Sequence, residues 1–316
     1  MTNLEKITQL RATLTQVVKP LINGKCHLTN LPYHTNIGDS LIWNGAIELL
    51  SSLKCSIASQ TSERTWHDTK VTAEDIIVFD GGGNIGDIWR ENMEFFLKVI
   101  DANHNNRIVL LPNSVWYSDQ NLIETDAQRM AAHPDLHLIA RDNYSYDLMN
   151  RYFGANHIYL APDMAFYIPD SKLAKARAIT PKEGTTLYLR RIDKEMAYQT
   201  GINPTDATTI SDWPSMTSPT LTDCMFPIIN SILWRCGMTR AIDAIAHRCV
   251  RDRYVKVGSR FIAGFDNIIT TRLHTLILSV LVGRPVQYID NISGKLSAYV
   301  DTWLSDLPTV RPYVRP

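Results

Sequence analysis

The segment 266–290 constrains the fold more than any other part of the chain. Residues 267–270 contain two β-branched isoleucines and predict a strand, while residues 273–282 are apolar at nearly every position and predict a buried helix. Gly-Arg-Pro at 283–285 ends that helix, and a second apolar run of strand length follows at 286–289. Strand, helix and strand in this order form a βαβ unit, so the segment predicts a parallel sheet.

The junction between the first strand and the helix carries the residue types of an anion-binding site. Thr270, Thr271, Arg272 and His274 follow one another there. Backbone N–H groups are free at the start of a helix, and the helix dipole adds about half a positive charge. A histidine on a buried helix is more often structural, but here it follows an arginine. We therefore expect a site for a small anion that carries more than one charge.

The first half of the chain repeats the strand-to-helix pattern. Apolar runs predict strands at 25–31, 75–80, 107–112, 136–140 and 157–160, and polar residues or glycines follow each of them. The carboxyl ends of parallel strands meet at one edge of a sheet, which is where open α/β sheets bind ligands. The residues expected along this edge are Asn36, Gly38, Asp39, Gly82, Gly83, Asn84, Ser114, Arg141 and Asp163.

Two of these stretches have a structural as well as a functional interpretation. Residues 36–39 fit a tight turn before a helix capped by Asp39 or Ser40, and they also fit a loop that presents Asn36 and Asp39 to a ligand. The glycine run at 81–83 fits a turn, and it also allows a ligand to approach the backbone closely. It matches neither the dinucleotide-binding fingerprint nor the P-loop.

The second half predicts another sheet. Residues 168–184, with two prolines and several charges, fit a linker between domains, and 185–189 fit a strand that ends at Arg190 and Arg191. This arginine pair fits a charged surface or a ligand-binding edge equally well. Residues 255–264 and 265–290 are expected to complete the second sheet.

Three other segments of the second half have weaker patterns. The polar segment 200–222 predicts a loop of about twenty residues. The basic amphipathic stretch 228–253 fits a solvated helix face, with contact to an acidic membrane surface as the alternative. A closing helix is expected at 295–304, followed by a mobile tail. The domain boundaries predicted from these patterns are 1–170, 171–290 and 291–316.

Composition excludes several classes of protein. The 316 residues are 45% hydrophobic and 20% charged, as in soluble globular proteins, and 32 basic residues balance 32 acidic ones, which argues against a nucleic-acid binder. The five cysteines form no CxxC pair, and no His/Asp/Glu cluster has metal-ligand spacing. We expect a cytoplasmic protein with reduced thiols and no metal. Because no apolar run approaches the ~20 residues that span a bilayer, we expect at most a peripheral membrane contact.

Several short motifs together resemble the polysaccharide pyruvyl transferase family. Their order and spacing, rather than any one of them, carry the resemblance from about residue 36 to residue 303. The motifs are NIGDSLI (36–42), DGGGN (80–84), ARDNYS (140–145), PDMAF (162–166), LYLRR (187–191), TRLHTLI (271–277), GRPVQYIDN (283–291) and GKLSAYVDTW (294–303). Residues 111–114, Leu-Pro-Asn-Ser, depart from the Gln-Ser or Gln-Thr of many members, which leaves open the polar group that contacts the ligand there.

The resemblance implies an α/β fold with two Rossmann-like domains that face a cleft, as in GT-B glycosyltransferases. It implies transfer of pyruvate from phosphoenolpyruvate to two hydroxyls of a sugar, often galactose or N-acetylmannosamine on a lipid-linked or polysaccharide carrier. Phosphoenolpyruvate is then a co-substrate, and no cofactor is needed. The second interpretation of the function is a GT-B glycosyltransferase that uses a nucleotide sugar. A third is a sugar-binding protein without catalytic activity.

The family's Arg-Leu-His motif matches residues 272–274, and its arginine after the first strand of the second domain matches Arg190, with Arg191 as the adjacent candidate. We expect these arginines, Thr271 and His274 to bind the donor. The edge of the first domain, from Asn36 to Arg141, is expected to bind the acceptor. His274 is the expected general acid or base, because the pKa of histidine lies near neutral pH, and Arg272, Asp39 and Asp163 are the other catalytic candidates.

Overall fold

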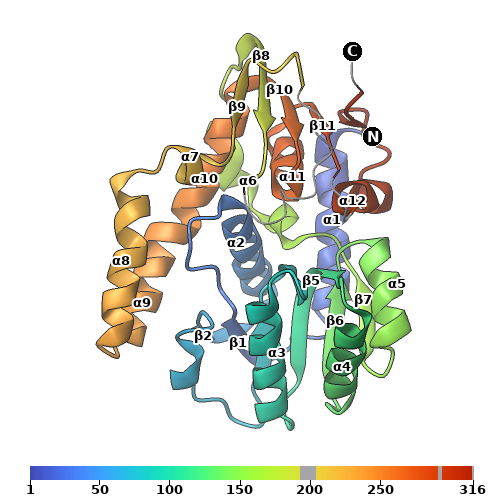
Figure 1. The fold of residues 1–316 in the computed structure, drawn as a ribbon, viewed down its shortest axis with the longest axis vertical. Coiled ribbons are helices and arrows are strands. Elements are labelled where there is room, and N and C mark those ends of the chain that lie inside the picture. Colours follow the sequence, from blue (N-terminus) through green and yellow to red (C-terminus); the bar gives the residue numbers. More distant parts are fainter. Residues whose placement is uncertain (193–203, 291–293, 315–316) are drawn as a thin grey trace.

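The computed structural model describes residues 1–192, 204–290 and 294–314. Within these residues the chain is an α/β protein with two sheets, and every strand pairing is parallel. Parallel neighbours need long crossover connections, which is why helices follow most strands. Figure 1 shows the two sheets at opposite ends of the molecule, with helices between them.

The first sheet has the strand order β2-β1-β3-β5-β6-β7, with β4 paired to β5. Its strands are β1 (Lys25–Thr29), β2 (Ser56–Gln60), β3 (Ile76–Phe79), β4 (Gly82–Gly86), β5 (Ile108–Trp116), β6 (Leu136–Ala140) and β7 (His157–Leu160). The direction of winding reverses between β1 and β3. At such a reversal the loops that follow the two strands diverge and leave a crevice for ligands.

The second sheet has the order β12-β11-β10-β8-β9. Its strands are β8 (Lys182–Leu189), β9 (Thr209–Ser211), β10 (Phe265–Thr270), β11 (Val286–Tyr288) and β12 (Val310–Pro312). Here the winding reverses between β8 and β10. Both sheets therefore place two adjacent carboxyl strand ends where a ligand can enter.

Twelve α-helices are described, together with short helical turns such as the 3-10 turn at Met164–Tyr167 and the π-helical turn at His247–Arg251. The α-helices are α1 (Asn3–Val18), α2 (Ile37–Ser52), α3 (Arg90–Ala102), α4 (Gln120–Ala131), α5 (Asn143–Tyr152), α6 (Asp170–Arg177), α7 (Pro214–Thr217), α8 (Leu221–Arg235), α9 (Thr239–Ala246), α10 (Asp252–Ala263), α11 (Leu273–Val282) and α12 (Lys295–Trp303). One hydrophobic cluster joins the sheets through the helices between them, and it contains Leu28 of β1, Trp43 of α2, Leu189 of β8 and Leu276 of α11.

The structure corrects several local predictions. Residues 255–264 belong almost entirely to α10, not to the second sheet, and the expected linker contains α6. The glycine run continues into β4. The predicted tail contains β12, which pairs with β11, so residues 310–312 are part of the second sheet. The expected polar loop contains β9 and α7 from residue 204 onward, and its first residues lie outside the described part.

Candidate active site

The start of α11 is fixed by hydrogen bonds between the ends of β8 and β10. The Thr270 hydroxyl donates to the Leu189 carbonyl (3.1 Å) and accepts from the Arg272 backbone N–H (2.9 Å). The Thr271 hydroxyl accepts from the Arg191 backbone N–H (3.1 Å). Arg272 is the N-cap residue, and no side chain caps this helix start. The two strand ends therefore hold Arg191 and Arg272 close to each other.

Arg272 has a carboxylate partner that sequence patterns did not indicate. Its Nε and Nη2 atoms each lie 2.6 Å from an oxygen of Asp212, in the loop after β9. Both side chains are buried, and the bidentate geometry fixes the plane of the guanidinium. Asp212 therefore sets the direction in which Arg272 faces.

His274 belongs to a buried polar network. Its Nε2 atom lies 3.2 Å from Asp163 Oδ2, and Arg141 Nη1 lies 2.9 Å from the same oxygen. Arg141 Nε in turn donates to the Ser114 hydroxyl (2.7 Å), which donates to Asp142 (2.8 Å). The network connects the carboxyl ends of β5, β6 and β7 to the first turn of α11.

Asp163 is the central acceptor of this network, and it has no solvent-exposed surface. Burial alone raises the pKa of the Asp163 carboxyl, but the charges and hydrogen bonds of His274 and Arg141 outweigh burial and lower the pKa to about 2. Asp163 is therefore a carboxylate at neutral pH, and it orients the His274 imidazole.

Gly38, in the first turn of α2, lets His274 approach the helix. A Cβ atom at Gly38 would lie 2.7 Å from His274 Nδ1, closer than real Cβ atoms approach other atoms. The glycine predicted from the NIGDSLI motif therefore leaves space for the histidine of the second half of the chain. Sequence analysis assigned Gly38 to acceptor binding and did not indicate this contact.

The start of α2 combines capping with a position at the site. The N-cap is Asn36, not Asp39 or Ser40, and Asn36 Oδ1 accepts the Gly38 backbone N–H (3.1 Å). The amide nitrogen of Asn36 donates to Asp39 (2.7 Å), and His34 Nε2 lies 3.6 Å from the same carboxylate. The structural and functional interpretations of this loop are therefore compatible.

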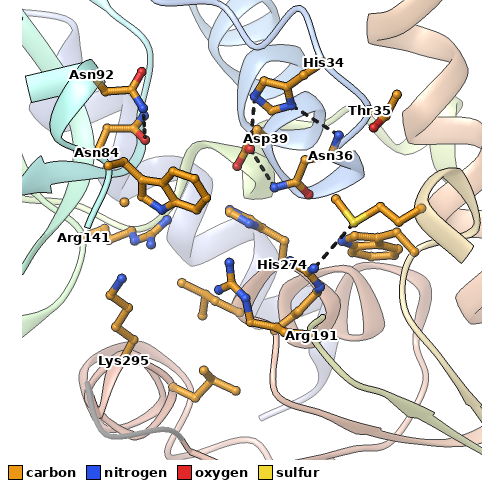
Figure 2. Close-up of a pocket in the computed structure, with 17 residues that line it drawn as sticks. His34, Thr35, Asn36, Asp39, Asn84, Asn92, Arg141, Arg191, His274 and Lys295 are labelled. Atoms are coloured by element: carbon orange, nitrogen blue, oxygen red, sulfur yellow. Dashed lines mark hydrogen bonds and ion pairs between the residues drawn. The ribbon is translucent and has the colours of Figure 1, made fainter. Parts of the chain in front are cut away.

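These elements surround a cavity of about 360 Å³, a size typical of small-molecule sites. Figure 2 shows Arg141, Arg191, His274 and Lys295 around this space. Of the predicted site residues, the cavity is lined by Asn36, Asp39, Gly83, Asn84, Arg141, Arg191, Arg272 and His274. The lining does not contain the others, namely Gly38, Gly82, Ser114, Asp163, Arg190 and Thr271.

The alternation of side chains along β8 separates the two candidate arginines. Leu187 and Leu189 face the main hydrophobic cluster, whereas Tyr188 packs into a separate small one. Arg190 continues on the Tyr188 side: burial raises the pKa of Tyr188, and the charge of Arg190 acts in the opposite direction. Arg191 continues on the leucine side and lines the cavity. Arg191 is thus the better-placed donor candidate.

Lys295 also lines the cavity, although the sequence analysis gave it no role. It begins α12, and an added Cβ at Gly83 would lie 3.4 Å from Arg141 Nη2 and 3.7 Å from Lys295 Nζ. A cation is unfavourable at a helix N-terminus, so a lysine at the start of the predicted helix 295–304 could have indicated a functional role for Lys295. Four cationic side chains thus lie at the cavity, namely Lys295, Arg141, Arg191 and Arg272. Arg141 is paired with Asp163 and Arg272 with Asp212, and Asp39 also lines the cavity.

Among the described residues, Asp135, His137 and His157 form a group that could hold a metal ion. They lie at the amino ends of β6 and β7, whereas the cavity lies at the carboxyl ends of the strands. Asp135 already pairs with Arg107 (3.0 Å) and His137 (2.7 Å). The absence of a metal from the reaction stays a prediction.

The fold and the cavity define an α/β protein in which cationic side chains line a pocket of small-molecule size. Residues 36–218 match the family model of polysaccharide pyruvyl transferases, and the relatives described next cover about nine-tenths of the chain. The chain therefore belongs to the polysaccharide pyruvyl transferase family and is a transferase, as the sequence motifs indicated.

Two curated relatives and one solved structure illustrate the similarity. Pyruvyl transferase 1 of Schizosaccharomyces pombe is 30% identical over 89% of this chain and 70% of its own. EpsO of Bacillus subtilis, provisionally named a pyruvyl transferase, is 26% identical over 89% of this chain and 85% of its own. A crystal structure from Klebsiella pneumoniae, of a protein without assigned function, covers 96% of this chain and 99% of its own, with a TM-score of 0.63 and 15% identity. That last likeness concerns the fold alone.

Proposed function

We propose that the protein transfers pyruvate from phosphoenolpyruvate to two hydroxyls of a sugar and forms a ketal. The observation that carries this proposal is the cavity in which four cations surround His274, which Asp163 orients. Phosphoenolpyruvate has a phosphate and a carboxylate, and arginine forks bind both groups in a bidentate manner. In this proposal the sheets belong to two Rossmann-like domains, with boundaries near 170 and 290, and the cavity is the cleft between them.

The residues of the second sheet bind the donor in this proposal. Arg191 and Arg272 hold the two anionic groups, Arg272 through the part of its guanidinium that Asp212 does not occupy. The uncapped start of α11 adds backbone N–H donors. Arg190 faces the other side of β8 and is not needed. Lys295 and Arg141 complete the positive surroundings, which stabilise the phosphate as it leaves.

His274 then supplies the proton that starts the reaction. It protonates the methylene carbon of phosphoenolpyruvate, and the central carbon becomes a cation stabilised by its oxygen substituent. A sugar hydroxyl attacks this carbon and loses its proton to Asp39, which passes it to the phosphate as the bond from the central carbon to the phosphate oxygen breaks. A second hydroxyl then attacks the same carbon, closes the ring and returns a proton to His274. Asp163 holds the imidazole through Nε2, which makes Nδ1 the proton-exchanging nitrogen.

We further propose that the acceptor is a galactose or N-acetylmannosamine residue of a lipid-linked or polysaccharide precursor. Leu221, Met225, Ile228 and Ile232 form an exposed apolar stripe on α8, and Arg235, Arg240 and Arg248 nearby in the chain are exposed as well. This combination supports peripheral contact with an anionic membrane that carries the acceptor. Among the described residues no helix is long and apolar enough to cross a membrane. The five free cysteines support a cytoplasmic location.

A phosphate-release assay with phosphoenolpyruvate and a panel of galactosides and N-acetylmannosaminides tests the proposal, with the ketal read by mass spectrometry. His274→Ala should abolish ketal formation and keep the fold, while the exposed His104→Ala should act as wild type. Release of a nucleoside diphosphate from a sugar nucleotide instead would establish the glycosyltransferase alternative. Full activity of His274→Ala would remove this residue from the mechanism.

A further inference from the structure

A second cavity, of about 420 Å³, adjoins the first. The two cavities share five lining residues, namely His34, Thr35, Asp39, Asn84 and Asn92. The second cavity lies where the loops after β1 and β3 diverge, and α8 contributes Pro227, Asn230 and Ser231 to it. None of its lining residues is among the donor-binding arginines or His274.

Two buried polar groups in this second cavity have incomplete hydrogen bonding. Asp80 Oδ1 and Asn230 Oδ1 have no hydrogen-bond partner among the described residues, and both residues are buried, with exposed fractions of 2% and 8%. A buried polar atom without a partner costs about 1–3 kcal/mol. The terminal torsions of Asp and Asn are broad, so a small rotation turns either oxygen toward the cavity. Such groups are typical of sites that a ligand completes.

The chemistry of the second cavity fits a neutral saccharide. Burial raises the pKa of the Asp80 carboxyl well above its usual value, the Gly81 backbone N–H acts in the opposite direction, and the nearby charges of Asp39 and Asp163 raise the pKa further. The neutral form is therefore favoured more than in a free carboxyl. A neutral carboxyl both donates and accepts a hydrogen bond, as the amides of Asn230 and Asn92 also do. Paired donors and acceptors of this kind match sugar hydroxyls.

We propose that the second cavity binds the sugar unit next to the one that receives pyruvate, with hydroxyls of that unit bonded to Asp80 and Asn230. This inference rests on the proposed function. The reacting unit then lies at the shared residues Asp39 and Asn84, within reach of the first cavity. The preferred acceptor is therefore an oligosaccharide of at least two units rather than a monosaccharide.

The experiment compares a monosaccharide acceptor with a disaccharide that contains it, using Asn230→Leu and the matched control Thr222→Ala on the exposed part of the same helix. We expect wild type to use the disaccharide with kcat/KM at least tenfold higher. Asn230→Leu should lower kcat/KM for the disaccharide about tenfold, the value of one buried hydrogen bond. Its kcat/KM for the monosaccharide and its KM for phosphoenolpyruvate should not change. Thr222→Ala should match wild type in every assay.

Calorimetric binding of the disaccharide in the absence of phosphoenolpyruvate gives a second measurement that does not depend on turnover. Asn230→Leu should weaken this binding in folded protein, whereas Asp80→Asn, which keeps one donor and one acceptor at the same place, should retain it. If Asn230→Leu lowers kcat/KM equally for the monosaccharide and the disaccharide, or leaves disaccharide binding unchanged, the inference is overturned. Ketal formation by wild type would still support the proposed function. Disaccharide binding that Asn230→Leu weakens, without any phosphate release, would instead overturn the proposed function and leave this cavity a saccharide site.

Discussion

Gly38→Ala should lower kcat strongly while the protein stays folded. An alanine Cβ would lie 2.7 Å from His274 Nδ1 and 3.1 Å from its Cβ and Cγ, whereas ordinary contacts begin at 3.4 Å. The imidazole must therefore move by about 0.7 Å, which disturbs its 3.2 Å contact with Asp163. A misplacement of ~1 Å costs about 100-fold in rate, so we expect a loss of roughly 10- to 100-fold in kcat.

The stability of the same variant should change little. Alanine gains about 1 kcal/mol over glycine inside a helix, and overpacking costs about 1–3 kcal/mol, so the net loss is at most about 2 kcal/mol. Phosphate release gives the rate, and urea unfolding gives the stability. The control is Gly24→Ala, where no atom lies within 4 Å of the added Cβ. Wild-type kcat in a folded Gly38→Ala protein would refute the role of this close approach.

Three further predictions follow from the site. Arg191→Ala should raise the KM for phosphoenolpyruvate at least tenfold and Arg190→Ala less than twofold, in steady-state kinetics; the opposite order would reassign the donor arginine. The fall in the pKa of Asp163 from 3.8 to about 2 corresponds to about 2 kcal/mol of folding free energy, present above pH 4 and lost toward pH 2. The stability difference between wild type and Asp163→Asn in urea unfolding should therefore shrink between pH 4 and pH 2, and a constant difference would contradict the assignment. Because burial raises the pKa of Asp80, its ionisation opposes folding increasingly above pH 4, so Asp80→Asn should raise the melting temperature at pH 8 more than at pH 4. An equal effect at both pH values would show that Asp80 does not titrate in this way.

The central strands and α11 could be predicted because nearly all of their residues are buried, whereas β7 is only partly buried and was predicted from its short apolar run. Residues 136–140 and 157–160 were predicted with the bounds of β6 and β7, and the apolar run 273–282 is α11. Such runs have few alternatives in a soluble chain. The strand β4 was missed because glycine has a low strand propensity. Its glycines instead allow β4 to lie close to the backbone of β5, since a Cβ at Gly86 would overlap the Trp116 carbonyl of β5.

The partners of the site residues could not be predicted. Asp212 and Arg272 are sixty residues apart in the chain, and Asp212 follows a polar segment without periodicity. Their contact depends on the pairing of β9 with β8 and of β8 with β10, which the sequence did not show. The choice between Arg190 and Arg191 was open for a similar reason. It depends on which face of β8 meets the hydrophobic cluster, and this is set by packing in three dimensions.

The cations of the first cavity come from the ends of β6, β8 and β10 and from α12, in a chain whose formal net charge is zero. Such a chain exerts little long-range electrostatic attraction on an anion, and salt screens the attraction of the cavity's own charges beyond about 10 Å. Substrate capture should thus depend weakly on ionic strength until the anion is inside. Only the assembled native state offers these charges together, so a dianion that binds there raises the temperature of unfolding, and the rise continues with the logarithm of its concentration after the site is full.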